Sequence, residues 1–130
     1  SQPTELSEQI AVVRSLRAAR VLFAAVPNGG RRDAREGRML KVSGVVAGVP
    51  DLLIFTRPPN MPEKCGVALE MKRSEGKPSD VTQAQREWMA KLEDLGWVCI
   101  IGYGAASPSL WMTCTNSTNR SAGCSMQSKP

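Results

Sequence analysis

An acidic and a basic side chain flank Met71 in the segment Glu70-Met71-Lys72. A further carboxylate, Asp51, precedes an apolar run earlier in the chain. Residues two apart on a β-strand point to the same face, so Glu70 and Lys72 should project together while Met71 points into packing. If the strand that Asp51 opens pairs with the strand that holds Glu70, two carboxylates and an ammonium converge on one patch. Carboxylates so placed repel each other unless a cation lies between them.

A patch of this composition suits a divalent cation. Mg²⁺ binds through one or two carboxylates, retained waters and substrate phosphate oxygens, and it can orient a phosphodiester and activate a water. Lys72 would then neutralise the negative charge of the transition state or position the attacking water. An E-x-K triplet by itself is common as a surface ion pair. Here the apolar residues before each charge are typical of buried strands, where charges are costly unless paired or functional.

The apolar pattern predicts the elements that must position these side chains. The predicted helices span residues 5–20, 31–42 and 80–95, and the predicted strands span residues 21–26, 51–55, 66–72 and 97–103. The second and third strands should form a hairpin with a long, proline-containing connection. This order is typical of a mixed α/β fold with a small central sheet flanked by helices.

Each predicted helix has an expected apolar face and expected ends. The first begins at the cap Thr4, the last begins at the cap Ser79, and Gly96 ends the last helix. The expected apolar faces are Leu6, Ile10, Val13 and Leu16 on the first helix, Met39, Leu40 and Val42 on the second, and Trp88, Leu92 and Leu95 on the last.

Composition and charge limit the classes of protein to consider. The 130 residues are enough for one domain, and the formal net charge is +5. Eight basic and two acidic residues lie between Arg14 and Lys41, an excess that suggests a polyanion partner, the alternative being a solvated basic face. No run approaches the length of a membrane span, so we expect no membrane partner and a cytoplasmic location.

Cysteine and histidine usage excludes several kinds of catalysis. The chain has no histidine and no C-x-x-C pair, which argues against a zinc site and removes Ser-His-Asp and Cys-His chemistry. The four cysteines should be free thiols in a reducing compartment, with Cys99 buried in an apolar run. Acid–base chemistry is left to carboxylates, lysine or a metal-bound water.

The pair P-D followed by E-x-K resembles the PD-(D/E)XK nuclease superfamily, and the flanking residues resemble the VRR-NUC family, the virus-type replication-repair nucleases, in its stand-alone phage form. The resemblance covers residues 5–104. The matching segments are Val26-Pro27-Asn28-Gly29-Gly30, Leu40-Lys41, Gly44-Val45, Gly48-Val49-Pro50-Asp51-Leu52, Leu69-Glu70-Met71-Lys72, Ser79, Gln85, Trp88, Leu92 and Gly96-Trp97.

The resemblance implies a restriction-endonuclease-like PD-(D/E)XK core and a role for each matching residue. Asp51 and Glu70 would bind Mg²⁺ or Mn²⁺, with the main-chain carbonyl of Met71 as a further ligand. Lys72 would be the catalytic lysine, and Gln85 would orient a phosphate or water. An acidic residue of the first helix commonly joins such sites: the prediction is Glu8, with Glu5 as the rival.

The basic segment that follows the Gly29-Gly30 turn should contact DNA through phosphates, and so with weak sequence preference and strong salt dependence. The predicted DNA-binding residues are Asn28, Arg31, Arg32, Arg35 and Lys41.

The resemblance implies a nuclease domain over residues 1–104 that acts on branched DNA as a homodimer, like a Holliday-junction resolvase, in a bacterial or phage-infected cell. A flap, nicking or restriction-like nuclease is one alternative, and a non-catalytic DNA-binding module is another. Residues 105–130 depart from the family pattern, because they are rich in Ser and Thr and show no clear amphipathic helix. We expect a C-terminal extension there that is mobile toward its end.

Overall fold

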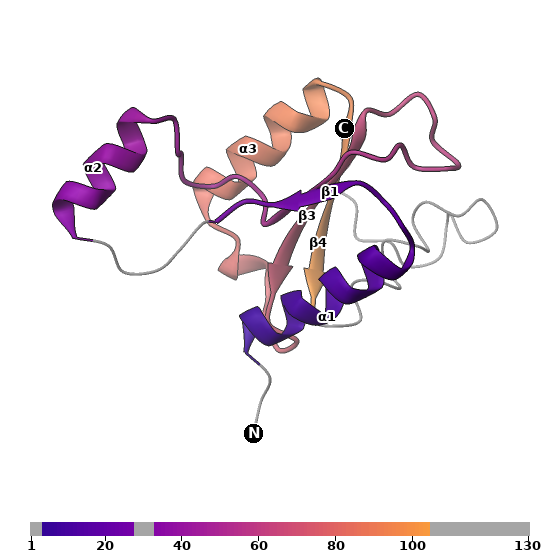
Figure 1. The fold of residues 1–130 in the computed structure, drawn as a ribbon, viewed down its shortest axis with the longest axis horizontal. Helices are drawn as coiled ribbons and strands as arrows, with labels where there is room; N and C mark the ends of the chain where they lie inside the picture. Colours follow the sequence, from indigo (N-terminus) through magenta and orange to yellow (C-terminus); the bar gives the residue numbers. More distant parts are fainter. Residues whose placement is uncertain (1–3, 28–32, 105–130) are drawn as a thin grey trace.

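Four strands form one mixed sheet with helices on both faces in the computed structural model, which describes residues 4–27 and 33–104 (Figure 1). The strands lie in the order β1 (Phe23–Ala25), β2 (Leu52–Ile54), β3 (Gly66–Lys72) and β4 (Trp97–Tyr103). β2 pairs antiparallel with both β1 and β3, whereas β3 and β4 are parallel. The predicted hairpin and the predicted mixed sheet are therefore confirmed.

The helices cover the sheet unequally. They are α1 (Glu5–Ala18), α2 (Ala34–Val42) and α3 (Gln83–Asp94), with a short 3-10 turn η1 (Pro78–Asp80) before α3. α1 and α3 pack on opposite faces of the sheet, while α2 stands apart from it (Figure 1). None of the helices in residues 4–27 and 33–104 is long and apolar enough to cross a membrane.

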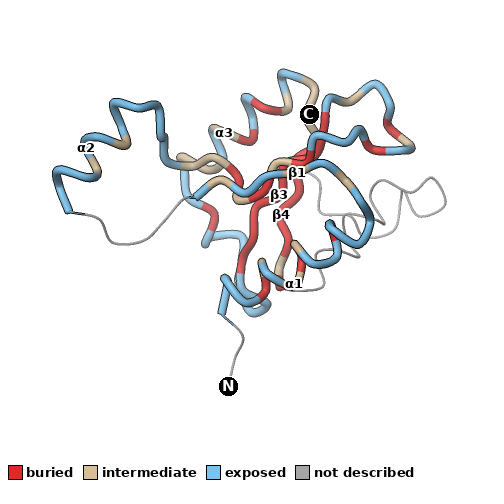
Figure 2. The backbone as a smooth tube through the Cα atoms, in the orientation of Figure 1, coloured by how far each residue is buried: buried red, intermediate tan, exposed pale blue. Residues whose placement is uncertain are grey.

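Every residue of β3 is buried, because β3 is an inner strand with a helix layer on each face (Figure 2). Leu69 and Met71 belong to the apolar cluster that includes Val12 and Leu16 of α1. Ala68 belongs to the other cluster, which includes Met89 and Leu92 of α3. Strand alternation therefore directs Glu70 and Lys72 toward the layer of α3, as Ala68 is directed.

The predicted apolar face of α1 is wrong in part. Leu6 is 66% exposed and Ile10 is 45% exposed, whereas the buried residues are Glu8, Val12 and Leu16, at intervals of four. The sequence offers two overlapping helical stripes here, and contact with the sheet selects the one that contains Glu8. The predicted cap is confirmed, since Thr4 Oγ1 accepts a hydrogen bond of 3.0 Å from Ser7 N.

The predicted start of the last helix is also wrong. Ser79 lies inside η1, and α3 begins after Thr82, whose hydroxyl accepts from Gln85 N at 3.1 Å. A Thr with Gln three residues later closes a capping box, which satisfies two free donors at once. Leu95 is 69% exposed at the helix end, and Met89 takes the buried place instead. Gly96, with φ of +96°, confirms the predicted stop.

α2 has no buried face. Its apolar residues Met39 and Val42, which were expected as anchors, are 64% and 84% exposed. The N-terminus of α2 is nonetheless capped, because Asp33 Oδ1 accepts a hydrogen bond of 2.8 Å from Glu36 N. The anchors are not buried because α2 stands apart from the sheet (Figures 1 and 2).

Candidate active site

The pairing of β2 with β3 brings Asp51 to Glu70. Leu52 lies opposite Leu69, so one antiparallel step further places Asp51 opposite Glu70. Asp51 Oδ2 accepts a hydrogen bond of 2.7 Å from the backbone N of Met71, which ties the carboxylate to the end of β3. Two carboxylates nineteen positions apart in the chain thus share one end of the hairpin, as the sequence predicts.

Glu70 and Lys72 form a buried polar network with Gln85 of α3. Lys72 Nζ lies 3.7 Å from Glu70 Oε2 and donates a hydrogen bond of 3.1 Å to Gln85 Oε1. Gln85 Nε2 donates in turn to Glu70 Oε2 at 3.2 Å. Glu70 is 2% exposed, Lys72 is 8% exposed and Gln85 is half-buried, so this network lies at the margin of the interior of the fold.

The surroundings of Glu70 make its ionised form unfavourable without a further cation. Burial and the negative charges of Asp51 and Glu5 raise the Glu70 pKa from 4.5 to about 8, and Lys72 only partly opposes them. Glu70 Oε1 is also buried without a hydrogen-bond partner. Such an oxygen is normally paired or bound to a metal ion.

The residues present therefore fit a divalent cation. Asp51 and Glu70 are hard oxygen donors of the kind that Mg²⁺ and Mn²⁺ prefer, and Glu70 Oε1 has a free lone pair inside the protein. The carbonyl of Met71 lies on the same strand between Glu70 and Lys72. That this carbonyl binds the metal ion stays a prediction.

The two candidate acids of α1 are placed differently. Glu8 is 4% exposed, its Oε2 has no hydrogen-bond partner, and its Oε1 lies 3.1 Å from where a Cβ would stand on Gly104. Glu5 is exposed, and its charge acts on Glu70. Within residues 4–27 and 33–104, no three His, Cys, Asp or Glu side chains gather closely enough to hold a metal ion. Glu8 as a metal ligand therefore stays a prediction.

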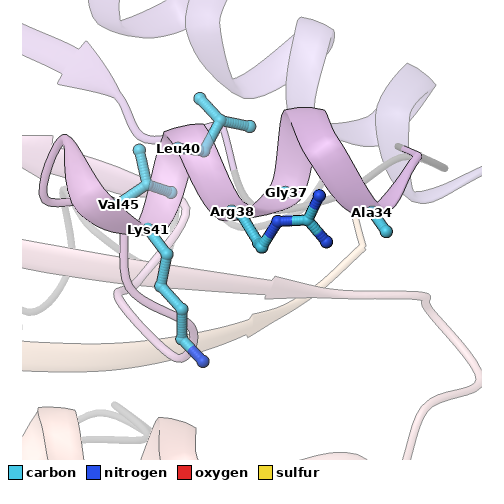
Figure 3. Close-up of a pocket in the computed structure, with 6 residues that line it drawn as sticks. All are labelled: Ala34, Gly37, Arg38, Leu40, Lys41 and Val45. Atoms are coloured by element: carbon cyan, nitrogen blue, oxygen red, sulfur yellow. The ribbon is translucent and has the colours of Figure 1, made fainter.

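Two of the predicted DNA-binding residues, Arg35 and Lys41, are exposed on α2. Lys41 lines a pocket together with Arg38, another basic residue of α2 (Figure 3). The other residues that line the pocket are Ala34, Gly37, Leu40 and Val45. The remaining predicted contacts, Asn28, Arg31 and Arg32, lie outside the described residues.

Sequence reasoning missed the part of Thr82 at this site. Its backbone N donates a hydrogen bond of 2.9 Å to Gln85 Oε1, the oxygen that also accepts from Lys72. The spacing Thr82-Gln83-Ala84-Gln85 carried the signal, because T-x-x-Q before a helix is a capping-box pattern.

Cys99 behaves as the sequence predicts. It is 1% exposed, and its Sγ lies 3.5 Å from the carbonyl oxygen of Met89. Burial raises the pKa of its thiol to about 12, with a smaller contribution from Glu93. Cys99 is therefore a protonated core residue.

The fold is similar to that of a solved structure described as a VRR_NUC domain protein. The TM-score is 0.58 at 23% sequence identity, and the alignment covers 85% of this chain and 86% of the other. No protein-family model matches the sequence, and no curated protein matches it. The predicted fold class is therefore confirmed. The predicted resemblance to the VRR-NUC family is confirmed at the level of the fold.

Proposed function

We propose that this protein is a metal-dependent DNA endonuclease of the VRR-NUC type, which hydrolyses phosphodiester bonds. The observation that carries the proposal is the buried network at the end of the β2–β3 hairpin. There Asp51 and Glu70 lie opposite each other, and Lys72 and Gln85 contact Glu70. The fold shared with a VRR_NUC domain protein supports the same conclusion.

Asp51 and Glu70 would hold the Mg²⁺ or Mn²⁺ ion, with the Met71 carbonyl and Glu8 as the further predicted ligands. When bound, the ion supplies Lewis-acid chemistry toward a phosphate oxygen and a coordinated water. Asp51 is held in place by Met71 N, so it needs little rearrangement to act as a ligand. Glu70 offers Oε1, which has no other partner.

Lys72 stabilises the negative charge that develops on the phosphate oxygens. Lys72 is 8% exposed and its ammonium is hydrogen-bonded to Gln85, so the ammonium has a defined position at the edge of the cation site. A charge held in advance in a poorly solvated site stabilises a transition state more than a mobile surface charge does. Gln85 maintains the separation between Lys72 and Glu70, because it contacts both.

The substrate we propose is branched DNA, contacted mainly through its phosphates by Asn28, Arg31, Arg32, Arg35 and Lys41. The net charge of +5 supports a polyanionic substrate. A four-way junction carries two symmetric scissile strands, so a homodimer would present one active site to each of them.

Cleavage assays test these proposals. The purified chain is incubated with labelled four-way junctions, flaps and linear duplex in Mg²⁺, Mn²⁺ or EDTA, beside Lys72→Ala. We expect paired symmetric nicks in the junction that need the metal ion and are lost in the variant. Cutting of flaps or linear duplex alone would retain the mechanism and reject the junction and the dimer. Binding of junctions without any cleavage would support the non-catalytic module.

A further inference from the structure

We propose that Thr82 is a positioning residue for this active site, because it closes the first turn of α3 around the amide that holds Lys72 and Glu70. The proposal rests on the proposed hydrolysis for its kinetic consequence. Thr82 contacts neither a cation nor a substrate in this account. It acts through Gln85.

The Gln85 amide has three partners, and together they determine its orientation. Oε1 accepts from Thr82 N at 2.9 Å and from Lys72 Nζ at 3.1 Å, and Nε2 donates to Glu70 Oε2 at 3.2 Å. Rotating the amide by half a turn would set its NH₂ group against two donors and its oxygen against a carboxylate. Only one orientation satisfies all three contacts.

Thr82 holds both the backbone and the side chain of Gln85. The Thr82 hydroxyl accepts from Gln85 N at 3.1 Å, and the Thr82 N–H donates to the Gln85 side chain. The oxygen that completes the helix cap is thus the oxygen that positions the lysine ammonium. Fraying of the first turn of α3 would therefore displace the partner of Lys72.

A glutamate at position 85 could serve an ordinary capping box equally well. Here it could still accept from Thr82 and from Lys72, but it would lose the donor to Glu70 and add a negative charge beside it. Only an amide fits both the cap and the carboxylate. The network thus requires more of residue 85 than helix capping does.

The same turn also contacts the loop that carries Asp51. A Cβ placed on Gly48 would lie 2.7 Å from the backbone C and O of Ala84, between Thr82 and Gln85. The closed first turn of α3 therefore touches the segments that hold Asp51, Glu70 and Lys72. Closing this turn holds Gln85 against Glu70 and Lys72 and brings the loop before Asp51 against α3.

The test compares Thr82→Val, which removes the hydroxyl but keeps the shape, with Thr82→Ser, which keeps the hydroxyl. Thr4→Val is the matched control, because Thr4 caps α1 in the same way, with Ser7 N at 3.0 Å, and has no bond to Gln85. We expect kcat for DNA cleavage to fall about tenfold in Thr82→Val with KM unchanged, the effect of roughly one lost hydrogen bond. Thr82→Ser should restore kcat. Thr4→Val should lower Tm as much as Thr82→Val does, and it should retain the kcat of the unsubstituted chain.

Equal loss of kcat in Thr4→Val and Thr82→Val would overturn the proposal, because the effect would then be one of general stability. So would a change confined to KM.

A second measurement separates this proposal from the proposed function. If the unsubstituted chain cuts no DNA, the nuclease proposal fails, and NMR of the Gln85 side-chain amide still tests the positioning. Its resonances should shift in Thr82→Val and stay in place in Thr4→Val. Unchanged Gln85 resonances in Thr82→Val would reject the positioning whatever the enzyme does.

Discussion

Glu70 is a single residue whose burial lowers the stability of the fold. A carboxylate on an inner strand loses its hydration, and here Asp51 adds a like charge. Lys72 and Gln85 both contact the same oxygen, Oε2, and leave Oε1 without a partner. A core apolar residue at this position would stabilise the sheet, so the retained acid is explained by the cation site that we propose.

This burial predicts a pH-dependent stability for the metal-free protein. The pKa of Glu70 is about 8 in the fold and about 4.5 as an isolated side chain, so between these values the folded protein binds a proton that the unfolded chain releases. The contribution of Glu70 to the free energy of unfolding therefore falls as pH rises from about 4.5 to about 8. Glu70→Gln should remove this slope and raise Tm at the alkaline end.

Thermal unfolding in EDTA at several pH values measures the effect. Glu75→Gln is the matched control, since Glu75 lies on the surface, 3.8 Å from Arg73. Its profile should follow that of the unsubstituted chain. Identical pH profiles for Glu70→Gln and the unsubstituted chain would show that Glu70 is ionised in the fold.

At the scale of elements, the loop before β2 must approach α3 closely. Gly48 has φ of +97° and would place a Cβ against the backbone of Ala84, whereas Gly44 has φ of +103° and open space around it. Gly48→Ala and Gly44→Ala should both lose about 1–2 kcal/mol of unfolding free energy through their backbone conformation. Gly48→Ala should lose at least about 1 kcal/mol more of unfolding free energy, because the added Cβ collides with the backbone of Ala84. It should lose cleavage activity as well.

Denaturant unfolding and cleavage rates of the two variants check this prediction. Equal losses of stability would show that only the backbone conformation matters at Gly48. Full activity in Gly48→Ala would show that the close contact with α3 does not position Asp51.

The face that α1 presents to the sheet is tested by a second pair of variants. Val12 is fully buried and Ile10 is 45% exposed. Val12→Ala should lower the free energy of unfolding by about 2–3 kcal/mol, and Ile10→Ala by less than about 1 kcal/mol, as denaturant unfolding would measure. A larger loss of unfolding free energy in Ile10→Ala than in Val12→Ala would show that α1 packs through Leu6 and Ile10, as periodicity favours. Glu8 would then point away from the interior.

For the whole molecule, the proposed DNA contacts predict a salt dependence of binding. Removing two phosphate contacts with Arg35→Ala plus Lys41→Ala should weaken junction binding. It should also reduce the slope of log affinity against log salt concentration by about 2. Fluorescence anisotropy of a labelled junction at several salt concentrations measures both.

The control removes two positive charges from α1 instead, with Arg14→Ala plus Arg17→Ala. A smaller change in slope is expected there, because these residues are not among the predicted contacts. An equal change in both double variants would show that binding depends on net charge alone and would reject α2 as a contact surface.

The sequence was sufficient to predict much of the fold and of the candidate site. The order of elements, the β2–β3 hairpin, the cap at Thr4 and the stop at Gly96 all depend on local patterns, and the structure confirms them. The convergence of Asp51, Glu70 and Lys72 also needed only strand alternation and one pairing. The errors occur where two local signals compete, as at Ser79 and Thr82, or where two apolar stripes overlap, as on α1.

The sequence by itself determined which residue types could act together and in what order they occur along the chain. Periodicity describes neighbours within one element, so it is sufficient for the shared face of Glu70 and Lys72. Only the tertiary structure decided the partners across elements: Gln85 against both of those residues, Glu8 on the buried side of α1, and α2 away from the sheet. These choices depend on how layers distant in sequence pack, and burial then determines the pKa of Glu70 and leaves its Oε1 unpaired.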